Sequence, residues 1–186
     1  MIDLSQVDKI LKLIEELSEK KALPIIGSER GRILVDILRE VKPKRVLEIG
    51  ALIGYSTILM GKELDNDAHL ITIEKDEGKA KIAKNNIETA RINPKIEVII
   101  GDALKVLPKL EGEFDLIFID AAKREYMKYF KLIEDKLHKG SVVVADNAGR
   151  FAESMKEYLD YVRSSKKYES KFVPVSNDGL EITTKI

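Results

Sequence analysis

The sequence contains no cysteine and no tryptophan, and only 6% of its 186 residues are aromatic. Without cysteine there are no disulfides, no thiolate metal sites and no thiol catalysis. No apolar run approaches the roughly 18 to 20 residues that span a bilayer, and the amphipathic N-terminus lacks the uninterrupted apolar core of a signal peptide. Lys plus Arg and Asp plus Glu each number 32, so the overall charge attracts neither nucleic acid nor anionic lipid. We therefore expect a globular protein of the cytoplasm without a membrane partner.

Short β-branched runs alternate with longer helical patterns along the chain. Several of these runs are almost continuously apolar, which is typical of strands that are covered on both faces. The alternation predicts a parallel sheet with helices on both sides. The predicted strands are residues 45–50, 69–75, 95–102, 114–120 and 141–147, and the predicted helices are residues 4–17, 31–40, 56–64, 77–91, 124–137 and 152–165.

The end of the chain departs from this alternation. Residues 168–176 and 180–186 are two strand-like runs joined by Asn177-Asp178-Gly179, and Asp-Gly between β runs indicates a hairpin because glycine tolerates positive φ. The prediction is one α/β domain over residues 1–186, with a doubly wound, mostly parallel seven-stranded sheet that ends in an antiparallel hairpin. The helices of residues 1–42 are expected to pack on or near the substrate side, with Ser28 as an N-cap.

The first predicted strand runs into a turn that contains two glycines, Gly50 and Gly54, and continues into Tyr55-Ser56. Ligands of open parallel sheets bind beyond the carboxyl ends of the strands. Glycine lets the backbone turn sharply there and lets a ligand approach without a Cβ in the way. The Gly-x-x-x-Gly spacing differs from the Gly-x-Gly-x-x-Gly of pyrophosphate sites. It favours a ligand without phosphates, and the alternative is a tight βα turn with no ligand.

Two more strand ends carry carboxylates. Glu74 follows Gly54 by 20 residues (74 − 54), the placement expected of an acid that accepts both ribose hydroxyls. It therefore indicates a nucleoside, and the alternative is a solvated acid at a strand end. Asp102, in Gly101-Asp102-Ala103, could accept from the amino group of adenine or could cap a helix.

The fourth and fifth predicted strands end in Asp120-Ala-Ala-Lys123 and Asp146-Asn147. Apolar strands rarely end in carboxylates without a partner, because desolvating an unpaired carboxylate costs several kcal/mol. Neighbouring parallel strands would bring the two acids together. With the amide oxygen of Asn147 they form an all-oxygen set suited to magnesium, manganese or calcium. Beside a divalent cation the uncharged amine of Lys123 is favoured, so it could accept the proton of a substrate hydroxyl. The alternatives are a turn at Asp146-Asn147, a helix cap at Asp120 and a surface lysine.

The segments VLEIGALIGYS, LITIEKD, FDLIFIDAAKREYMKY and VVVADN together resemble the cation-dependent O-methyltransferases, a family that includes catechol and caffeoyl-coenzyme A O-methyltransferases. The resemblance extends from Pro24 to the closing Asp178-Gly-Leu-Glu-Ile and implies the Rossmann-like class I methyltransferase fold. It also implies S-adenosylmethionine as cofactor, Mg²⁺ or a similar cation, and a small catechol-like substrate with adjacent oxygens. The implied cofactor-binding residues are Glu48, Gly50, Gly54, Tyr55, Ser56, Glu74, Lys75, Asp102, Ala103 and Asp120; the implied metal ligands are Asp120, Asp146 and Asn147; Lys123 would take the proton, and Glu181 would meet a substrate hydroxyl.

The chain also departs from that family. Ala122 stands where relatives usually have an aspartate, and Ala148-Gly149-Arg150-Phe151 replaces an apolar residue, an aromatic and glycine. The segments that normally cover the substrate are shorter, so the acceptor does not follow from the resemblance. Methylation of a hydroxylated uridine in tRNA is the main alternative, favoured by Lys123, Arg124 and Arg150 and opposed by the neutral overall charge. A nicotinamide-dependent oxidoreductase and a non-catalytic binding module are further alternatives. Relatives are commonly dimers, so a homodimer is expected.

Overall fold

The computed structural model describes residues 5–186, and the predicted helix start at Leu4 lies outside the described residues. None of the helices within this part of the chain is both long and apolar enough to cross a membrane. Short 3₁₀ segments precede or follow several of the helices. The helices are α1 (Gln6–Lys21), α2 (Gly27–Val41), α3 (Tyr55–Glu63), α4 (Glu77–Ala90), α5 (Ala103–Val106), α6 (Tyr126–Ile133) and α7 (Lys156–Ser164); the strands are β1 (Arg45–Ile49), β2 (His69–Glu74), β3 (Lys95–Ile100), β4 (Phe114–Ile119), β5 (Leu137–Asp146), β6 (Tyr168–Val175) and β7 (Asp178–Lys185).

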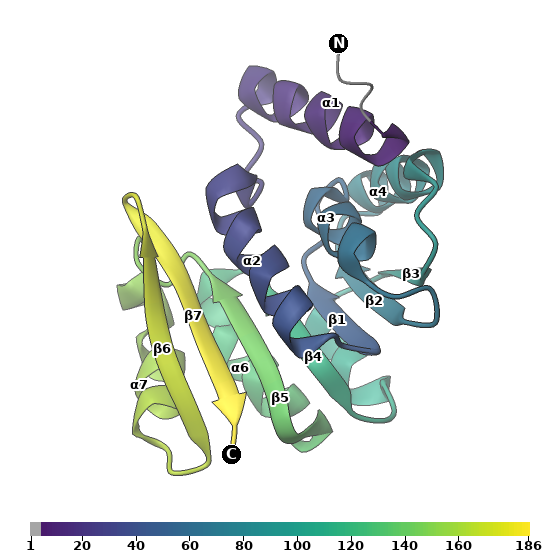
Figure 1. The fold of residues 1–186 in the computed structure, drawn as a ribbon. Coiled ribbons are helices and arrows are strands. Elements are labelled where there is room, and N and C mark those ends of the chain that lie inside the picture. Colours follow the sequence, from purple (N-terminus) through teal and green to yellow (C-terminus); the bar gives the residue numbers. More distant parts are fainter. Residues whose placement is uncertain (1–4) are drawn as a thin grey trace.

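The strands form one seven-stranded sheet in the order β3-β2-β1-β4-β5-β7-β6 (Figure 1). β1 to β5 pair in parallel, and β7 pairs antiparallel with both β5 and β6. The predicted doubly wound sheet with a closing antiparallel hairpin is therefore confirmed. The winding direction reverses between β1 and β4, where ligands of such sheets bind.

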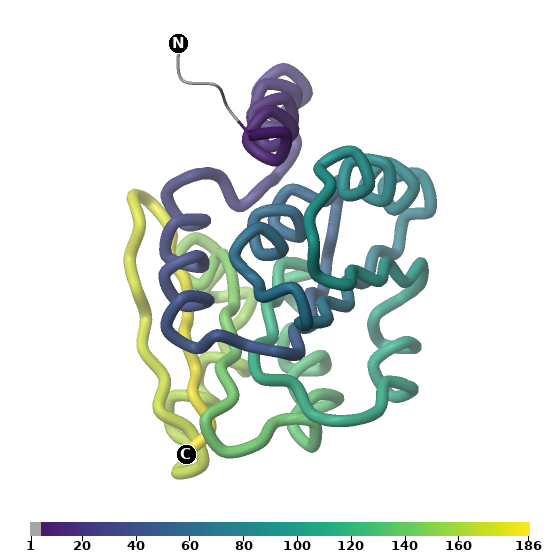
Figure 2. Tube along the Cα trace, turned by 45° about the vertical axis from the view of Figure 1, so that its right-hand side comes forward, coloured from purple at the N-terminus to yellow at the C-terminus, as the bar shows by residue number. Residues whose placement is uncertain are grey.

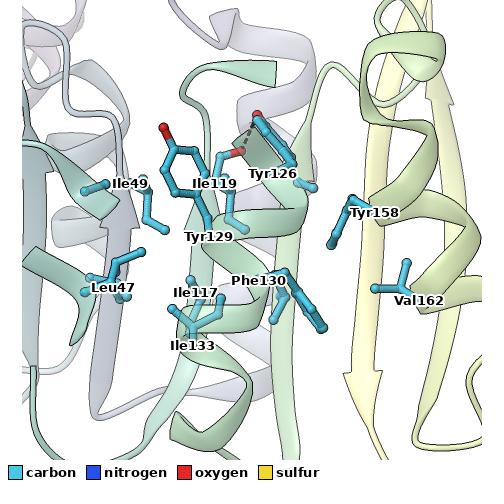
Figure 3. Packing of buried hydrophobic residues seen from close by; sticks show 14 of the residues in the cluster. Leu47, Ile49, Ile117, Ile119, Tyr126, Tyr129, Phe130, Ile133, Tyr158 and Val162 are labelled. Atoms are coloured by element: carbon cyan, nitrogen blue, oxygen red, sulfur yellow. Dashed lines mark hydrogen bonds between the residues drawn. The ribbon is translucent and has the colours of Figure 1, made fainter. Parts of the chain in front are cut away.

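Alternate residues of each central strand feed two separate cores, as the period of two along a strand requires. Val46 of β1 belongs to one core and its neighbour Leu47 to the other. Helices α1 to α4 cover the first face, and α5 to α7 cover the second. Figure 2 shows α1 lying across one end of the molecule, where it contacts α3 and α4. The second core is rich in aromatic rings, and Figure 3 shows Tyr126, Tyr129, Phe130 and Tyr158 gathered between the sheet, α6 and α7.

Three local predictions were wrong. Ser28 is not an N-cap, because Ile26 already has helical dihedral angles and α2 begins at Gly27. The predicted helix over residues 124–137 is a single α-helix only from Tyr126 to Ile133, and Leu137 already pairs with Phe114 as the start of β5. The hairpin turn falls on Ser176 and Asn177, while Asp178 and Gly179 are paired within β7. The side chain of Asp178 makes contacts outside the hairpin, described below, that hold it in the strand.

Candidate active site

A cleft of about 620 Å³ opens at the carboxyl ends of β1 to β5, within the size range of small-molecule sites. The loop before α2 closes one side of it with Pro24, Ile25 and Ile26, so part of the predicted N-terminal segment does lie at the cleft. Most of the residues predicted from sequence line this cleft: Gly50, Tyr55, Ser56, Glu74, Lys75, Asp102, Ala103, Asp120, Lys123, Asp146 and Asn147.

Gly50 and Gly54 shape the turn between β1 and α3. Both have positive φ, at 102° and 88°. A Cβ on Gly50 would lie 2.2 Å from the carbonyl oxygen of Asp120, so glycine lets the ends of β1 and β4 meet beside the cleft. Gly54 does not line the cleft; it begins α3 and packs against Ala83. Its visible role is in the turn and in packing.

Glu48 lies beneath the cleft and does not line it. Its side chain is 0% exposed and accepts hydrogen bonds from the hydroxyls of Ser56, Thr57 and Thr72. Burial raises the pKa of Glu48 to about 7, and the nearby charge of Asp120 also raises it. Glu48 thus holds the first turn of α3, and Ser56, whose hydroxyl is committed to it, presents the surface that a ligand would meet.

Replacing Glu48 by Gln should flatten the pH dependence of stability. Because the pKa of Glu48 is raised on folding from 4.5 to about 7, the folded state holds a proton that the unfolded state has released. The free energy of unfolding therefore falls as pH rises from about 5 to 8, by on the order of 3 kcal/mol for one such group. Urea unfolding at pH 5, 6, 7 and 8 should give a smaller slope for Glu48→Gln than for wild type.

The exposed Glu77 provides the matched control for that series. Glu77→Gln should keep the wild-type slope. Asp146, whose pKa is also raised, keeps some slope in every variant without metal. Equal slopes in Glu48→Gln and Glu77→Gln would contradict the assignment of a buried, titrating carboxyl to Glu48.

Glu74 stands at the end of β2 with its carboxylate held from both sides. One oxygen accepts the backbone N–H of Leu52 at 2.8 Å, and the other accepts that of Asp76 at 2.9 Å. A carboxylate has about four lone-pair positions, so each oxygen can accept a further hydrogen bond. The side chain is therefore tied to the turn after β1, and it lines the cleft.

Asp102 lines the cleft and caps α5, which is one of the two roles considered for it. One oxygen caps α5 by accepting the N–H of Leu104 at 3.1 Å, and the other lies 3.1 Å from the ammonium of Lys75. The hydrogen bond from Lys75 is the main cause that lowers the pKa of Asp102, so the carboxylate is ionised and can accept from an amino group. Lys75 itself is exposed, and Ala103 follows Asp102 on the cleft wall.

Asp120 and Asp146 emerge side by side from β4 and β5. Ile119 pairs with Ala145 in the parallel register, so each acid is the next residue along its own strand. The side chain of Asp146 is 1% exposed, and burial, followed by the charge of Asp120, raises its pKa to about 7. The structure therefore brings the two carboxylates together at the cleft, as predicted.

Two cationic side chains neutralise this pair. Lys123 Nζ donates to Asp120 Oδ1 at 2.7 Å and to the hydroxyl oxygen of Tyr126 at 3.0 Å. Arg30 Nε, from α2, lies 3.0 Å from Asp146 Oδ1 without the geometry of a hydrogen bond. The buried Tyr126 hydroxyl also contacts the carbonyl oxygens of Ile119 and Asp146, and Figure 3 marks the first of these contacts. Tyr126 thus joins the ends of both strands to Lys123.

The residues present fit a divalent cation. Asp146 Oδ1 is buried with no hydrogen-bond partner, and two adjacent carboxylates favour a positive charge between them. Asn147, in the left-handed region at φ 64°, donates through its amide nitrogen to Asp178, so its amide oxygen is the atom that could bind a cation. Across residues 5–186 no three His, Cys, Asp or Glu side chains gather to hold a metal ion. A site here therefore depends on the Asn147 amide as its third protein ligand.

The structure places Glu181 away from the cleft, and the expectation that it meets a substrate hydroxyl is withdrawn. Glu181 pairs with Ala145 across β7 and β5, so its side chain points to the face covered by α7. There it is 0% exposed and accepts two hydrogen bonds from Arg163, at 2.9 and 2.6 Å, and one from Ser170. Strand alternation turns it to the other side of the sheet from Arg30.

The sequence did not point to Arg30 and Asp178, which line the cleft, or to the buried Tyr126, which contacts Lys123. Arg30 reaches Asp178 across 148 positions of sequence, and no local pattern indicates such a pair. Tyr126 follows Lys123 by three residues, and that spacing on a helix start was the one available signal. Asp178 was interpreted only as a turn residue.

Three comparisons with known proteins give consistent matches. A family model described as O-methyltransferase matches residues 4–168. The chain is 35% identical over 169 residues to catechol O-methyltransferase B of Danio rerio, covering 84% of this chain and 63% of that protein. It is 25% identical over 166 residues to a caffeoyl-CoA O-methyltransferase of Stellaria longipes, covering 83% and 69%. The O-methyltransferase from Bacillus cereus, solved in complex with SAH, matches with a TM-score of 0.88 and 25% identity over 100% of this chain and 93% of that chain. The chain thus spans less than two thirds of the Danio rerio protein.

Proposed function

The chain belongs to the O-methyltransferase family, and on that premise we propose that it transfers a methyl group from S-adenosylmethionine to a hydroxyl of a small molecule with adjacent oxygens, assisted by a divalent cation. One observation carries the proposal: Asp120, Asp146 and Lys123 meet at the same cleft whose other end is formed by Glu74 and Asp102. The proposed nucleoside site and the proposed cation site would therefore face the same space. The named relatives methylate catechol and caffeoyl-CoA, and adjacent oxygens are common to both molecules.

In the proposed complex, the nucleoside lies along the ends of β1 to β3. Glu74 accepts hydrogen bonds from the ribose hydroxyls, and Asp102 accepts one from the adenine amino group. Tyr55 and Ser56, in the first turn of α3, border the methionine part. The hydroxyl of Tyr55 donates to Glu15 of α1, which fixes the ring at the cleft wall.

Glu74→Gln should weaken the binding of S-adenosylhomocysteine by roughly 10- to 100-fold, because a hydrogen bond to a charged group contributes about 1.5–3 kcal/mol. The amide keeps the size of the side chain but has a single acceptor oxygen. Isothermal titration calorimetry measures the change directly. Glu77→Gln, on the exposed face of α4, is the matched control with an expected wild-type affinity. Wild-type affinity in Glu74→Gln would remove this residue from the nucleoside site.

When bound, S-adenosylmethionine would supply an electrophilic methyl group, and a cation held by Asp120, Asp146 and Asn147 would lower the pKa of a neighbouring hydroxyl. Lys123 would then accept the proton of that hydroxyl. Its contact with Asp120 then stabilises the ammonium that forms, and Tyr126 fixes the position of Nζ. The cleft walls hold the reactants aligned, which can contribute roughly 7 to 11 kcal/mol to the acceleration.

A methyl-transfer assay tests the proposal. Labelled S-adenosylmethionine is incubated with the protein, Mg²⁺ and one acceptor at a time: catechol, caffeoyl-CoA, phenol and bulk tRNA. We expect label in catechol or caffeoyl-CoA, none in phenol, which lacks the second oxygen, and none in any acceptor when EDTA replaces Mg²⁺. Label in tRNA alone would replace the small-molecule acceptor by RNA, and equal labelling with EDTA would remove the cation from the reaction.

A further inference from the structure

We propose that Asp178 is a positioning residue of the cation site, which it organises from the β6–β7 hairpin without binding the ion itself. The inference rests on the proposed function, since it concerns the site formed by Asp120, Asp146 and Asn147. Asp178 is the first residue of β7, and only 8% of its surface is exposed.

The two carboxylate oxygens of Asp178 are fully engaged by five donors. Oδ2 accepts from Asn147 Nδ2 at 2.6 Å and from Arg30 Nη1 at 2.7 Å. Oδ1 accepts the backbone N–H groups of Gly149, Arg150 and Gly179, at 3.2, 2.9 and 2.9 Å. This carboxylate therefore has no free oxygen to offer a cation, although it borders the cleft.

The contact with Asn147 fixes the orientation of its amide. If the amide were rotated by 180°, its oxygen would face Asp178 Oδ2 at 2.6 Å, and two acceptors cannot share that contact. The nitrogen must therefore point to Asp178, and the oxygen points away from it. Partners of metal ligands commonly orient them in this way. Asp178 thus presents to the cation the one atom of Asn147 that is able to bind it.

Asp178 also gives Arg30 a second partner. The guanidinium of Arg30 donates to Asp178 through Nη1, and its Nε lies 3.0 Å from Asp146. A cation that binds Asp146 repels this guanidinium, and a buried charge without a partner is costly. Because Asp178 holds the other side of the guanidinium, Arg30 stays paired when Asp146 is engaged. The hairpin carboxylate therefore serves both neighbours of the ion.

The test measures Mn²⁺ affinity by calorimetry in the presence of S-adenosylhomocysteine, a readout that does not depend on turnover. Asp178→Asn should weaken Mn²⁺ binding by roughly 10- to 100-fold, the usual effect of losing a partner of a metal ligand, while the affinity for S-adenosylhomocysteine stays unchanged. The matched control is Asp115→Asn. Asp115 also accepts backbone N–H groups, from Lys44 and Arg45, but it lies near the start of β4, at the end of the strand away from the cleft, so Mn²⁺ affinity should not change.

A double-variant comparison separates positioning from general loosening of the hairpin. In an Asn147→Ala background, Asp178→Asn should lower Mn²⁺ affinity by clearly less than it does in wild type, because no amide remains to be oriented and only the contact with Arg30 is lost. A structural role alone predicts the same loss in both backgrounds. Should Asp178→Asn not fold, Asp178→Glu takes its place in both arms; it keeps the charge but displaces the oxygens, with the same expected direction.

Two failures are distinguishable. In the first, wild type binds Mn²⁺, but folded Asp178→Asn binds it equally well or loses the same Mn²⁺ affinity in the Asn147→Ala background. The positioning role of Asp178 is then wrong, and the proposed function stands. If wild type itself binds no Mn²⁺ in the presence of S-adenosylhomocysteine, the cation in the proposed function is wrong, and the inference falls with it.

Discussion

Lys123→Met is expected to lower kcat for methyl transfer by about 10²- to 10⁴-fold, the range contributed by a positioned acid or base. Methionine keeps the length of the side chain but can neither take a proton nor pair with Asp120. The structure gives Lys123 Nζ two fixed partners, Asp120 and the Tyr126 hydroxyl. The amine is therefore held next to the position that a substrate oxygen beside Asp120 would occupy. Single-turnover transfer of labelled methyl, measured at saturating substrate, reports the change.

The affinity for S-adenosylhomocysteine should stay unchanged in this variant, because Lys123 contacts Asp120 after β4, whereas Glu74 and Asp102 lie at the ends of β2 and β3. Lys139→Met, on an exposed part of β5, is the matched control and should retain wild-type kcat. A kcat for Lys123→Met within threefold of wild type would show that another group takes the proton.

Asp146→Asn is expected to abolish measurable Mn²⁺ binding and to lower kcat/KM by on the order of 10³-fold, since cation stabilisation of a reacting oxygen contributes several kcal/mol. EDTA treatment of wild type should give a loss of the same size, and added Mg²⁺ should reverse it in wild type but not in the variant. Calorimetry with Mn²⁺ and the labelled-methyl assay measure the two effects on the same preparations.

The loss in Asp146→Asn should not come from unfolding. Burial and Asp120 raise the pKa of Asp146 to about 7, so above that pH the folded, metal-free protein carries a buried charge that the amide lacks. The stability of wild type therefore falls as pH rises through about 7, and at pH 8 Asp146→Asn should be at least as stable in urea. Full activity of Asp146→Asn with added Mg²⁺ would remove this residue from the cation site.

The sheet, and the end of the sheet at which the cleft lies, could be predicted because they follow from local patterns and one topological rule. Apolar runs identified the five parallel strands, and the carboxyl ends of such strands share one edge. This placed Asp120 beside Asp146 and both at the same cleft as Glu74, as the register of β4 and β5 confirms.

The remaining features depend on long-range contacts that no local pattern encodes. The role of Glu181 was inferred from the family resemblance alone. The face that it occupies depends on strand register, because a shift of one residue reverses the face of every side chain, and its pairing with Ala145 is known only from the sheet. Asp178 was taken for a turn residue, but its five donors come from α2, from β7 itself and from residues 147–150. Arg30 supplies one of them from 148 positions away.

The most direct test of the central claim is anomalous diffraction from crystals grown with Mn²⁺ and S-adenosylhomocysteine. We expect one strong manganese peak within coordination distance, roughly 2.0–2.3 Å, of an oxygen of each of Asp120, Asp146 and Asn147, with the nucleoside bound against Glu74. A nucleoside in place with no manganese peak between those three side chains, and with Asp146 still facing Arg30, would contradict the account.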